Sequence, residues 1–104
     1  MISVVVPCYN ESNNIQICYK RITENLLQIS HIYEIIFVDD GSTDNTFSKL
    51  FSISENDKKV KVVKLSRNFG HQNAIYAGLE SISGDCVFLI DADCQNVIKI
   101  ISDY

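Results

Sequence analysis

The stretch Cys86-Val87-Phe88-Leu89-Ile90-Asp91-Ala92-Asp93 decides how the rest of this chain is interpreted. A short apolar run of this kind is typical of a buried β-strand. Ionised acids are costly to bury, so Asp91 and Asp93 should lie at the end of that strand, outside the core. There both carboxylates could bind one hard divalent cation, which in turn holds phosphate. The alternative is that the two acids only cap the next turn.

The composition predicts one domain that is neither a nucleic-acid binder nor a zinc protein. The chain has 104 residues, of which 46% are hydrophobic, and its net charge is −4. A nucleic-acid partner would need a basic face, which this charge does not favour. The four cysteines form no C-x-x-C pair. No leader and no membrane-length apolar run is visible. We therefore expect a cytoplasmic location, free or associated with the cytoplasmic face of a membrane.

Strand-like runs and helical periodicities alternate along the chain. Strands are predicted at Ile2–Val6, Tyr33–Val38, Val60–Leu65 and Cys86–Ile90. Helices are predicted from Ile15 to about Leu27 and from His71 to Ile82, the latter with Gly84 as a left-handed cap. Another helix is predicted after Thr43 or Asp44, either of which could cap it, and its buried residues would be Phe47, Leu50 and Phe51. The residues from Val97 to Tyr104 look like the start of another helix.

This β-α-β-α-β-α-β order predicts an α/β protein with a doubly wound, mostly parallel sheet. In such sheets ligands bind beyond the carboxyl ends of the strands. Polar loops follow all four predicted strands, namely Pro7–Glu11, Asp39–Asp44, Ser66–Gly70 and Asp91–Gln95. We therefore expect these loops to form one site.

The phosphate-binding fingerprints of other α/β proteins are missing. Neither G-x-G-x-x-G nor G-x-x-x-x-G-K-[ST] occurs in the sequence. Phosphate would then need a divalent ion on Asp93, together with Asp91 or Gln95. Asp39 or Asp40 could accept a hydrogen bond from the N–H of a nucleobase, or both could simply form the turn.

Three further residues in these loops suit a nucleotide, and each has a structural alternative. Tyr9 could stack on the base or pack against the neighbouring loop. Arg67 could contact phosphate or form an ion pair with one of the acids. Glu11 could face the ligand or act as an acid near the first turn of a helix, where the helix dipole favours it.

The four loop motifs resemble those of family 2 glycosyltransferases, in particular dolichyl-phosphate mannose synthase and bacterial polyprenyl-phosphate glycosyltransferases. They read Val6-Pro7-Cys8-Tyr9-Asn10-Glu11, Val38-Asp39-Asp40-Gly41-Ser42-Thr43-Asp44, Ser66-Arg67-Asn68-Phe69-Gly70 and Asp91-Ala92-Asp93-Cys94-Gln95. The resemblance extends over all 104 residues. It implies a GT-A fold and an inverting transfer from a UDP- or GDP-sugar to a polyprenyl-phosphate or glycan acceptor, with Mg2+ or Mn2+ as cofactor.

The resemblance also implies roles for individual residues. The implied nucleotide-binding residues are Pro7, Tyr9, Glu11, Asp40 and Arg67. The implied residues at the metal and the diphosphate are Asp91, Asp93 and Gln95.

The chain departs from the family pattern after these motifs. The family usually continues from Gln95 with an acid and two prolines, where this chain has Asn96, Val97 and Ile98. The carboxylate that an inverting transfer needs, and the acceptor-binding half, lie beyond Tyr104 in the family. We therefore expect residues 1–104 to be a donor-binding part, with no identified catalytic base and little transferase activity alone.

The sequence has one structural consequence and leaves two competing functions open. Without later strands, Cys86–Ile90 would be an unpaired apolar edge, and we expect a homo-oligomer to form through it. One competing function is a non-catalytic nucleotide-binding or assembly module that works through a partner chain. The other is phosphate transfer, which the absence of a lysine from the four loops disfavours.

Overall fold

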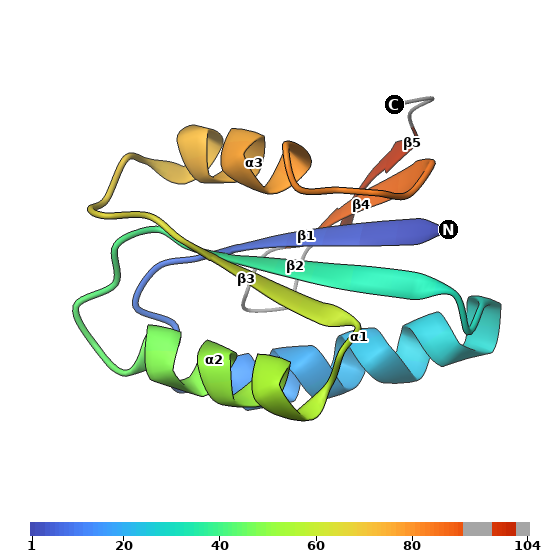
Figure 1. The fold of residues 1–104 in the computed structure, drawn as a ribbon, viewed down its shortest axis with the longest axis horizontal. Helices are drawn as coiled ribbons and strands as arrows, with labels where there is room; N and C mark the ends of the chain where they lie inside the picture. Colours follow the sequence, from blue (N-terminus) through green and yellow to red (C-terminus); the bar gives the residue numbers. More distant parts are fainter. Residues whose placement is uncertain (91–96, 102–104) are drawn as a thin grey trace.

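The computed structural model describes residues 1–90 and the backbone of residues 97–101, and it forms a central sheet with helices on both faces (Figure 1). The strands are β1 (Ile2–Cys8), β2 (Tyr33–Asp39), β3 (Val60–Lys64), β4 (Cys86–Ile90) and β5 (Val97–Ile101). The helices are α1 (Ile15–Ile29), α2 (Thr46–Asn56) and α3 (His71–Leu79). None of the described helices is both long enough and apolar enough to span a bilayer.

The sheet has the order β3-β2-β1-β4-β5, and its first four strands are parallel. Helices α1 and α2 cover one face, and α3 covers the other (Figure 1). Successive residues of β1 point to opposite faces, so that Val4 and Val6 join the core under α1 and α2, whereas Val5 joins the core under α3. This burial on both faces explains the continuous apolar runs. The predicted doubly wound, mostly parallel α/β fold is confirmed.

Two predictions about the C-terminal part are wrong. Val97–Ile101 forms strand β5, antiparallel to β4, where we predicted the start of a helix. Four of its five residues are β-branched, which favours a strand, and pairing satisfies the apolar edge of β4. Cys86–Ile90 is consequently paired on both sides, with β1 and β5. The predicted oligomer through an unpaired edge at 86–90 therefore loses its basis.

Smaller differences concern the helix boundaries and faces. Helix α2 buries Thr46, Leu50 and Ile53. Phe51, which we predicted to be buried, is 51% exposed, so the buried face of the helix differs from the predicted one. Helix α3 ends at Leu79, before the predicted boundary at Ile82. Gly84 is not a left-handed cap, because the described glycines with positive φ are at other positions. Its missing side chain instead allows close packing, since a Cβ there would lie 2.4 Å from the carbonyl oxygen of Met1.

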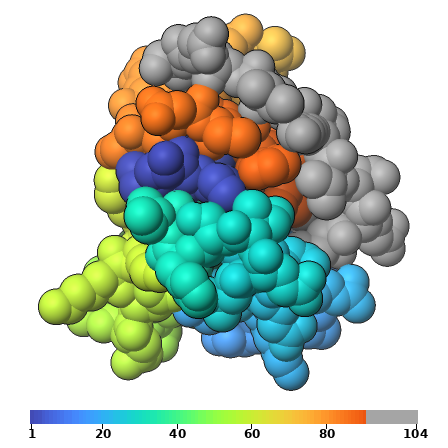
Figure 2. Space-filling view, turned by 90° about the vertical axis from the view of Figure 1, so that its right-hand side faces the viewer, coloured from blue at the N-terminus to red at the C-terminus, as the bar shows by residue number. Residues whose placement is uncertain are grey.

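A buried carboxylate connects several strands at the end of the sheet that lies opposite the polar loops. Glu34 accepts a hydrogen bond from Ser3 Oγ at 2.6 Å and another from the backbone N–H of Ser83, and it pairs with Lys61 Nζ at 3.0 Å. Figure 2 views this end, where the N-terminus, the residues before β2 and the residues before β4 lie side by side. Burial alone would raise the pKa of Glu34, but these donors and the Lys61 charge lower it below 4.5.

Replacing Glu34 with glutamine should lower the free energy of unfolding by about 2 kcal/mol at pH 7, because a buried ionic acceptor of several hydrogen bonds is lost. The folded-state pKa is depressed, so this stabilisation is present above pH 4.5 and is lost as the pH falls through the folded-state pKa. Urea unfolding of both proteins between pH 3 and pH 7 measures the effect. A difference between them that does not shrink at acid pH would contradict this account.

Candidate functional site

The carboxyl ends of β1 and β2 and the loop that follows β3 surround a pocket of about 160 Å3. The backbone ladder brings these segments together, since Asp40 N–H donates to Cys8 O at 2.8 Å and Leu65 N–H donates to Asp39 O at 2.9 Å. The residues that line the pocket are Pro7, Cys8, Tyr9, Asp40, Asn68, Gly70 and His71. Three predicted nucleotide-binding residues, Pro7, Tyr9 and Asp40, therefore lie in one cavity.

Tyr9 and Asp40 give this pocket an aromatic ring and a carboxylate. Tyr9 immediately follows β1, and it is 45% exposed, so it is not packed away against the neighbouring loop. Asp40 is only 3% exposed, and its Oδ1 accepts a hydrogen bond from the backbone N–H of Phe69 at 2.8 Å. The carboxylate thus both lines the pocket and anchors the loop that forms its opposite wall.

Gly41 allows that loop to come close. Its φ is +69°, a conformation that glycine adopts readily, and a Cβ at this position would lie 2.2 Å from the carbonyl carbon of Arg67. The backbone of Arg67 and Asn68 is consequently packed directly on the turn that carries Asp40. The distance between the two pocket walls therefore depends on a glycine at position 41.

Asp39 has a different environment from Asp40. It is 1% exposed, it does not line the pocket, and its Oδ1 accepts a hydrogen bond from Ser42 N–H at 3.2 Å. Its Oδ2 is buried without a hydrogen-bond partner among the residues that the structure describes. The sequence left open whether Asp39 or Asp40 faces a ligand, and the geometry favours Asp40, with Asp39 forming the turn.

Glu11 and Arg67 lie near the pocket but do not line it. The Glu11 side chain accepts a hydrogen bond from Asn14 Nδ2 at 2.8 Å, and its carbonyl oxygen accepts from the N–H groups of Asn14 and Ile15 where α1 begins. The Arg67 guanidinium lies over the Phe69 ring, 4.7 Å from its centroid, an arrangement that is favourable for a cation. Both side chains have local structural partners, so the structure leaves their predicted nucleotide contacts untested.

The pocket also contains residues that we did not single out from the sequence, namely Cys8, Asn68, Gly70 and His71. His71 begins α3, as predicted, but the same position also places it at the wall of the pocket. The signal was present for all four, because Cys8 lies in the candidate loop Pro7–Glu11, Asn68 and Gly70 lie in the candidate loop Ser66–Gly70, and His71 follows that loop directly. The pattern could not show which side of that loop faces inward.

The predicted metal residues Asp91, Asp93 and Gln95 lie outside the described residues. Within the described residues, no group of three acidic, histidine or cysteine side chains could hold a metal ion. Strand β4 is parallel to β1 and directly beside it, so the segment after Ile90 begins at the edge of the sheet where Pro7 and Tyr9 lie. The chain position of the acids therefore suits the pocket, and their geometry remains untested.

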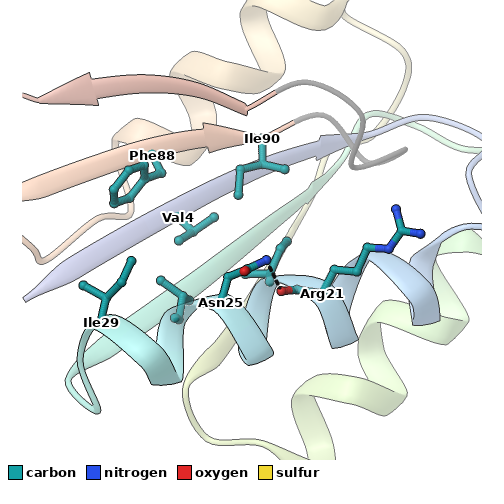
Figure 3. Close-up of a pocket in the computed structure, with 8 residues that line it drawn as sticks. Val4, Arg21, Asn25, Ile29, Phe88 and Ile90 are labelled. Carbon is teal, nitrogen blue, oxygen red and sulfur yellow. Dashed lines mark hydrogen bonds between the residues drawn. The ribbon is translucent and has the colours of Figure 1, made fainter.

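A larger cavity, of about 340 Å3, lies away from these loops, between α1 and strands β1 and β4 (Figure 3). Val4, Phe88 and Ile90 extend from the strands toward α1, with Ile29 at one end and Arg21 at the other. Asn25, also in its wall, donates a hydrogen bond to Arg21 O at 2.8 Å. Among the described residues the lining of this cavity is mostly apolar and includes no carboxylate, which suits an apolar ligand better than a nucleotide.

Comparison with known proteins identifies the family. The model of the glycosyl transferase family 2 matches residues 3–98. An uncharacterized glycosyltransferase of Bacillus subtilis (strain 168), YkcC, is 43% identical over 99 residues, which are 95% of this chain and 31% of that protein. The undecaprenyl-phosphate 4-deoxy-4-formamido-L-arabinose transferase of Serratia proteamaculans is 44% identical over 96 residues, or 91% of this chain and 29% of that protein.

Solved structures agree with these sequence relatives. Residues 1–349 of S. aureus TarS, in complex with UDP-GlcNAc, superpose with a TM-score of 0.74 at 27% identity, covering 88% of this chain and 26% of that chain. The mannosyltransferase PcManGT of Pyrobaculum calidifontis, in complex with GDP-Man and Mn2+, gives a TM-score of 0.72 at 27% identity, covering 88% of this chain and 27% of that protein. The expected similarity to GT-A glycosyltransferases is thus confirmed at the level of the fold.

The chain spans about a third of the length of the curated relatives that it matches. The matched part begins in β1 and extends into β5, so it contains all four parallel strands and the loops at their carboxyl ends. Since one family model accounts for nearly the whole chain, in the order and with the fold expected, this protein belongs to glycosyl transferase family 2.

Proposed function

We propose that residues 1–104 are the donor-binding part of a glycosyltransferase and bind the nucleotide of a UDP- or GDP-sugar. The observation that carries this proposal is the pocket at the carboxyl ends of the strands, where Tyr9 and Asp40 follow the neighbouring strands β1 and β2 and both line the cavity. An aromatic ring suits stacking on a nucleobase, and a carboxylate suits a base N–H donor. The TarS and PcManGT structures, which hold UDP-GlcNAc and GDP-Man, support both nucleotides as candidates.

Asp91, Asp93 and Gln95 would hold a divalent cation at the diphosphate in this proposal. Carboxylate and amide oxygens are the ligands that Mg2+ and Mn2+ prefer, and the bound cation would neutralise charge on the leaving diphosphate. The Mn2+ in PcManGT supports a divalent metal in this fold.

The acceptor that we propose is a polyprenyl phosphate, and the transfer would invert the anomeric configuration. The support for the acceptor is the name of the Serratia proteamaculans relative, an undecaprenyl-phosphate transferase. The support for inversion is the resemblance of the loop motifs to those of inverting family members. Residues 1–104 then supply the donor side, and a phosphate oxygen of the acceptor, which is ionised near neutral pH, would attack the anomeric carbon as the nucleoside diphosphate leaves.

Calorimetric titration of residues 1–104 with UDP and GDP, with and without Mn2+, tests the proposal. Wild-type protein should bind one nucleotide more tightly with Mn2+, and Asp93→Asn should lose that dependence on the metal because a carboxylate ligand becomes a neutral amide. Asp85→Asn is the matched control, since that carboxylate is 92% exposed at the opposite end of β4 and should bind like wild type. Failure of the folded wild-type protein to bind either nucleotide would refute the proposal.

A further inference from the structure

The segment between β1 and α1 and the segment between β2 and α2 are joined by side-chain hydrogen bonds. Asn10 N–H donates to Ser42 Oγ at 3.0 Å, and Thr43 N–H donates to Asn10 Oδ1 at 2.8 Å. Thr43 Oγ1 donates to the same Asn10 oxygen at 3.3 Å. We call these three bonds, made by Asn10, Ser42 and Thr43, the clasp.

A second set of hydrogen bonds joins the same two segments next to the clasp. Glu11 N–H donates to Thr46 Oγ1 at 2.9 Å, and Ser12 N–H donates to Asp44 Oδ2 at 3.4 Å. Lys49 Nζ donates to Ser12 O at 2.6 Å. Asp44 also accepts from Thr46 N–H at 2.9 Å, although the cap position of α2 is Asn45 and not Thr43 or Asp44, where we predicted it. The two segments are thus held as one unit along their length.

Asn10 has a backbone conformation that suits this role. Its φ is +53°, and among the described residues it is the non-glycine residue with positive φ. Asparagine tolerates this left-handed conformation better than most residues, although it remains uncommon. The conformation turns the Asn10 side chain so that one oxygen receives both donors of Thr43. Strain of this kind persists where surrounding contacts determine it, and it is frequent in functional sites.

The clasp joins the two neighbouring segments that carry Tyr9 and Asp40. Asn10 directly follows Tyr9 in one segment, and Ser42 and Thr43 follow Asp40 and Gly41 in the other. Asn10 is itself exposed and does not line the pocket. Because the Asn10 side chain is exposed, it contributes little to the packing of the core. It nevertheless keeps an unfavourable φ and accepts two hydrogen bonds from the segment after β2. Its contribution therefore concerns the shape of the site.

We infer that Asn10 is a positioning residue, which sets the position of Tyr9 relative to Asp40 so that one nucleobase can contact both. This inference rests on the proposed donor-binding function. The clasp restricts the two loops in the free protein, so less conformational entropy is lost when the nucleotide binds. Without it, the loops would have to be ordered by the nucleotide, and affinity would fall although Asn10 touches no part of the ligand.

Three replacements at position 10 separate the side-chain oxygen from the backbone conformation. Asn10→Asp keeps both the acceptor and a tolerated positive φ, so it should bind nucleotide within about threefold of wild type. Asn10→Gly keeps the conformation but removes the acceptor, and it should bind about tenfold more weakly. Asn10→Ala loses both and should be weaker still. Asn13→Gly, the same change at an exposed position in the same segment, is the matched control and should bind like wild type.

Ser42→Ala opens the clasp from the other loop without changing Asn10, and it should also weaken binding while the melting temperature stays close to that of wild type. Calorimetry with UDP or GDP, whichever wild type binds, gives the affinities, and thermal melting confirms the fold. Loss of affinity in Asn10→Gly and Ser42→Ala, with rescue in Asn10→Asp, is the expected result. Equal affinity for all variants would overturn the inference.

Hydrogen exchange at the Thr43 amide separates this inference from the proposed function, because it needs no ligand. The amide should be protected in wild type and in Asn10→Asp, and exchange at least tenfold faster in Asn10→Gly. Absence of nucleotide binding by wild type would refute the donor-binding function, whereas unchanged exchange in Asn10→Gly would overturn the clasp itself.

Discussion

Replacing Gly41 with alanine is expected to lower the free energy of unfolding by about 3 kcal/mol and to disrupt the pocket. The alanine would have to adopt a φ of +69°, which costs about 1 kcal/mol or more outside glycine. Its Cβ would also meet the carbonyl carbon of Arg67 at 2.2 Å and the amide nitrogen of Asn68 at 2.3 Å. Backbone atoms cannot rotate away as a side chain can, so the loop must move, at a further cost of about 1–3 kcal/mol.

Gly70→Ala is the natural comparison for Gly41→Ala. Gly70 also has a positive φ, of +100°, but a Cβ there would meet no atom within 4 Å. Alanine at position 70 therefore carries the conformational strain without the clash, and the exposed loop around it can relax. Urea unfolding of the two variants should show the larger loss for Gly41→Ala. Equal losses, or a Gly41→Ala protein as stable as wild type, would mean that the loop is not packed on this turn as described.

Asp40→Asn is expected to weaken nucleotide binding by about 10- to 100-fold while changing the free energy of unfolding by about 1 kcal/mol or less. The asparagine oxygen can still accept the hydrogen bond from Phe69 N–H, so the anchor of the loop is kept. The other oxygen becomes an NH2 group, which cannot accept a hydrogen bond from the N–H of a nucleobase. Loss of a charged hydrogen bond of this kind costs about 1.5–3 kcal/mol, which corresponds to the stated range in affinity.

Asp39→Asn provides the contrast for that experiment. Asp39 directly precedes Asp40 in the chain, yet its carboxylate is buried outside the pocket and bonds to Ser42 N–H. The asparagine oxygen can keep this bond, so nucleotide affinity should stay within a few-fold of wild type. Titration of both variants with the same nucleotide therefore shows which acid contacts the base. A greater loss of affinity in Asp39→Asn than in Asp40→Asn would reverse the assignment.

Local patterns were sufficient for most of the fold. The β-branched runs and helical periodicities predicted all four parallel strands and three helices, with boundaries that differ by a few residues at most. The prediction failed at Val97–Ile101, because an apolar β-branched segment without a clear period can form either a strand or a helix. Pairing with β4, a contact decided by the tertiary structure, makes it a strand.

The amino-acid sequence was sufficient for the class of fold and for the place of the first three polar loops at the carboxyl ends of their strands, because each depends on local pattern and on the rules of parallel sheets. The tertiary structure alone decided which loop atoms meet. It separated Asp40 in the pocket from Asp39 in the turn, brought Asn68 and His71 into the wall, and joined Asn10 to Thr43. These contacts link residues about 30 positions apart, such as Phe69 and Asp40, and no pattern within a single segment encodes them.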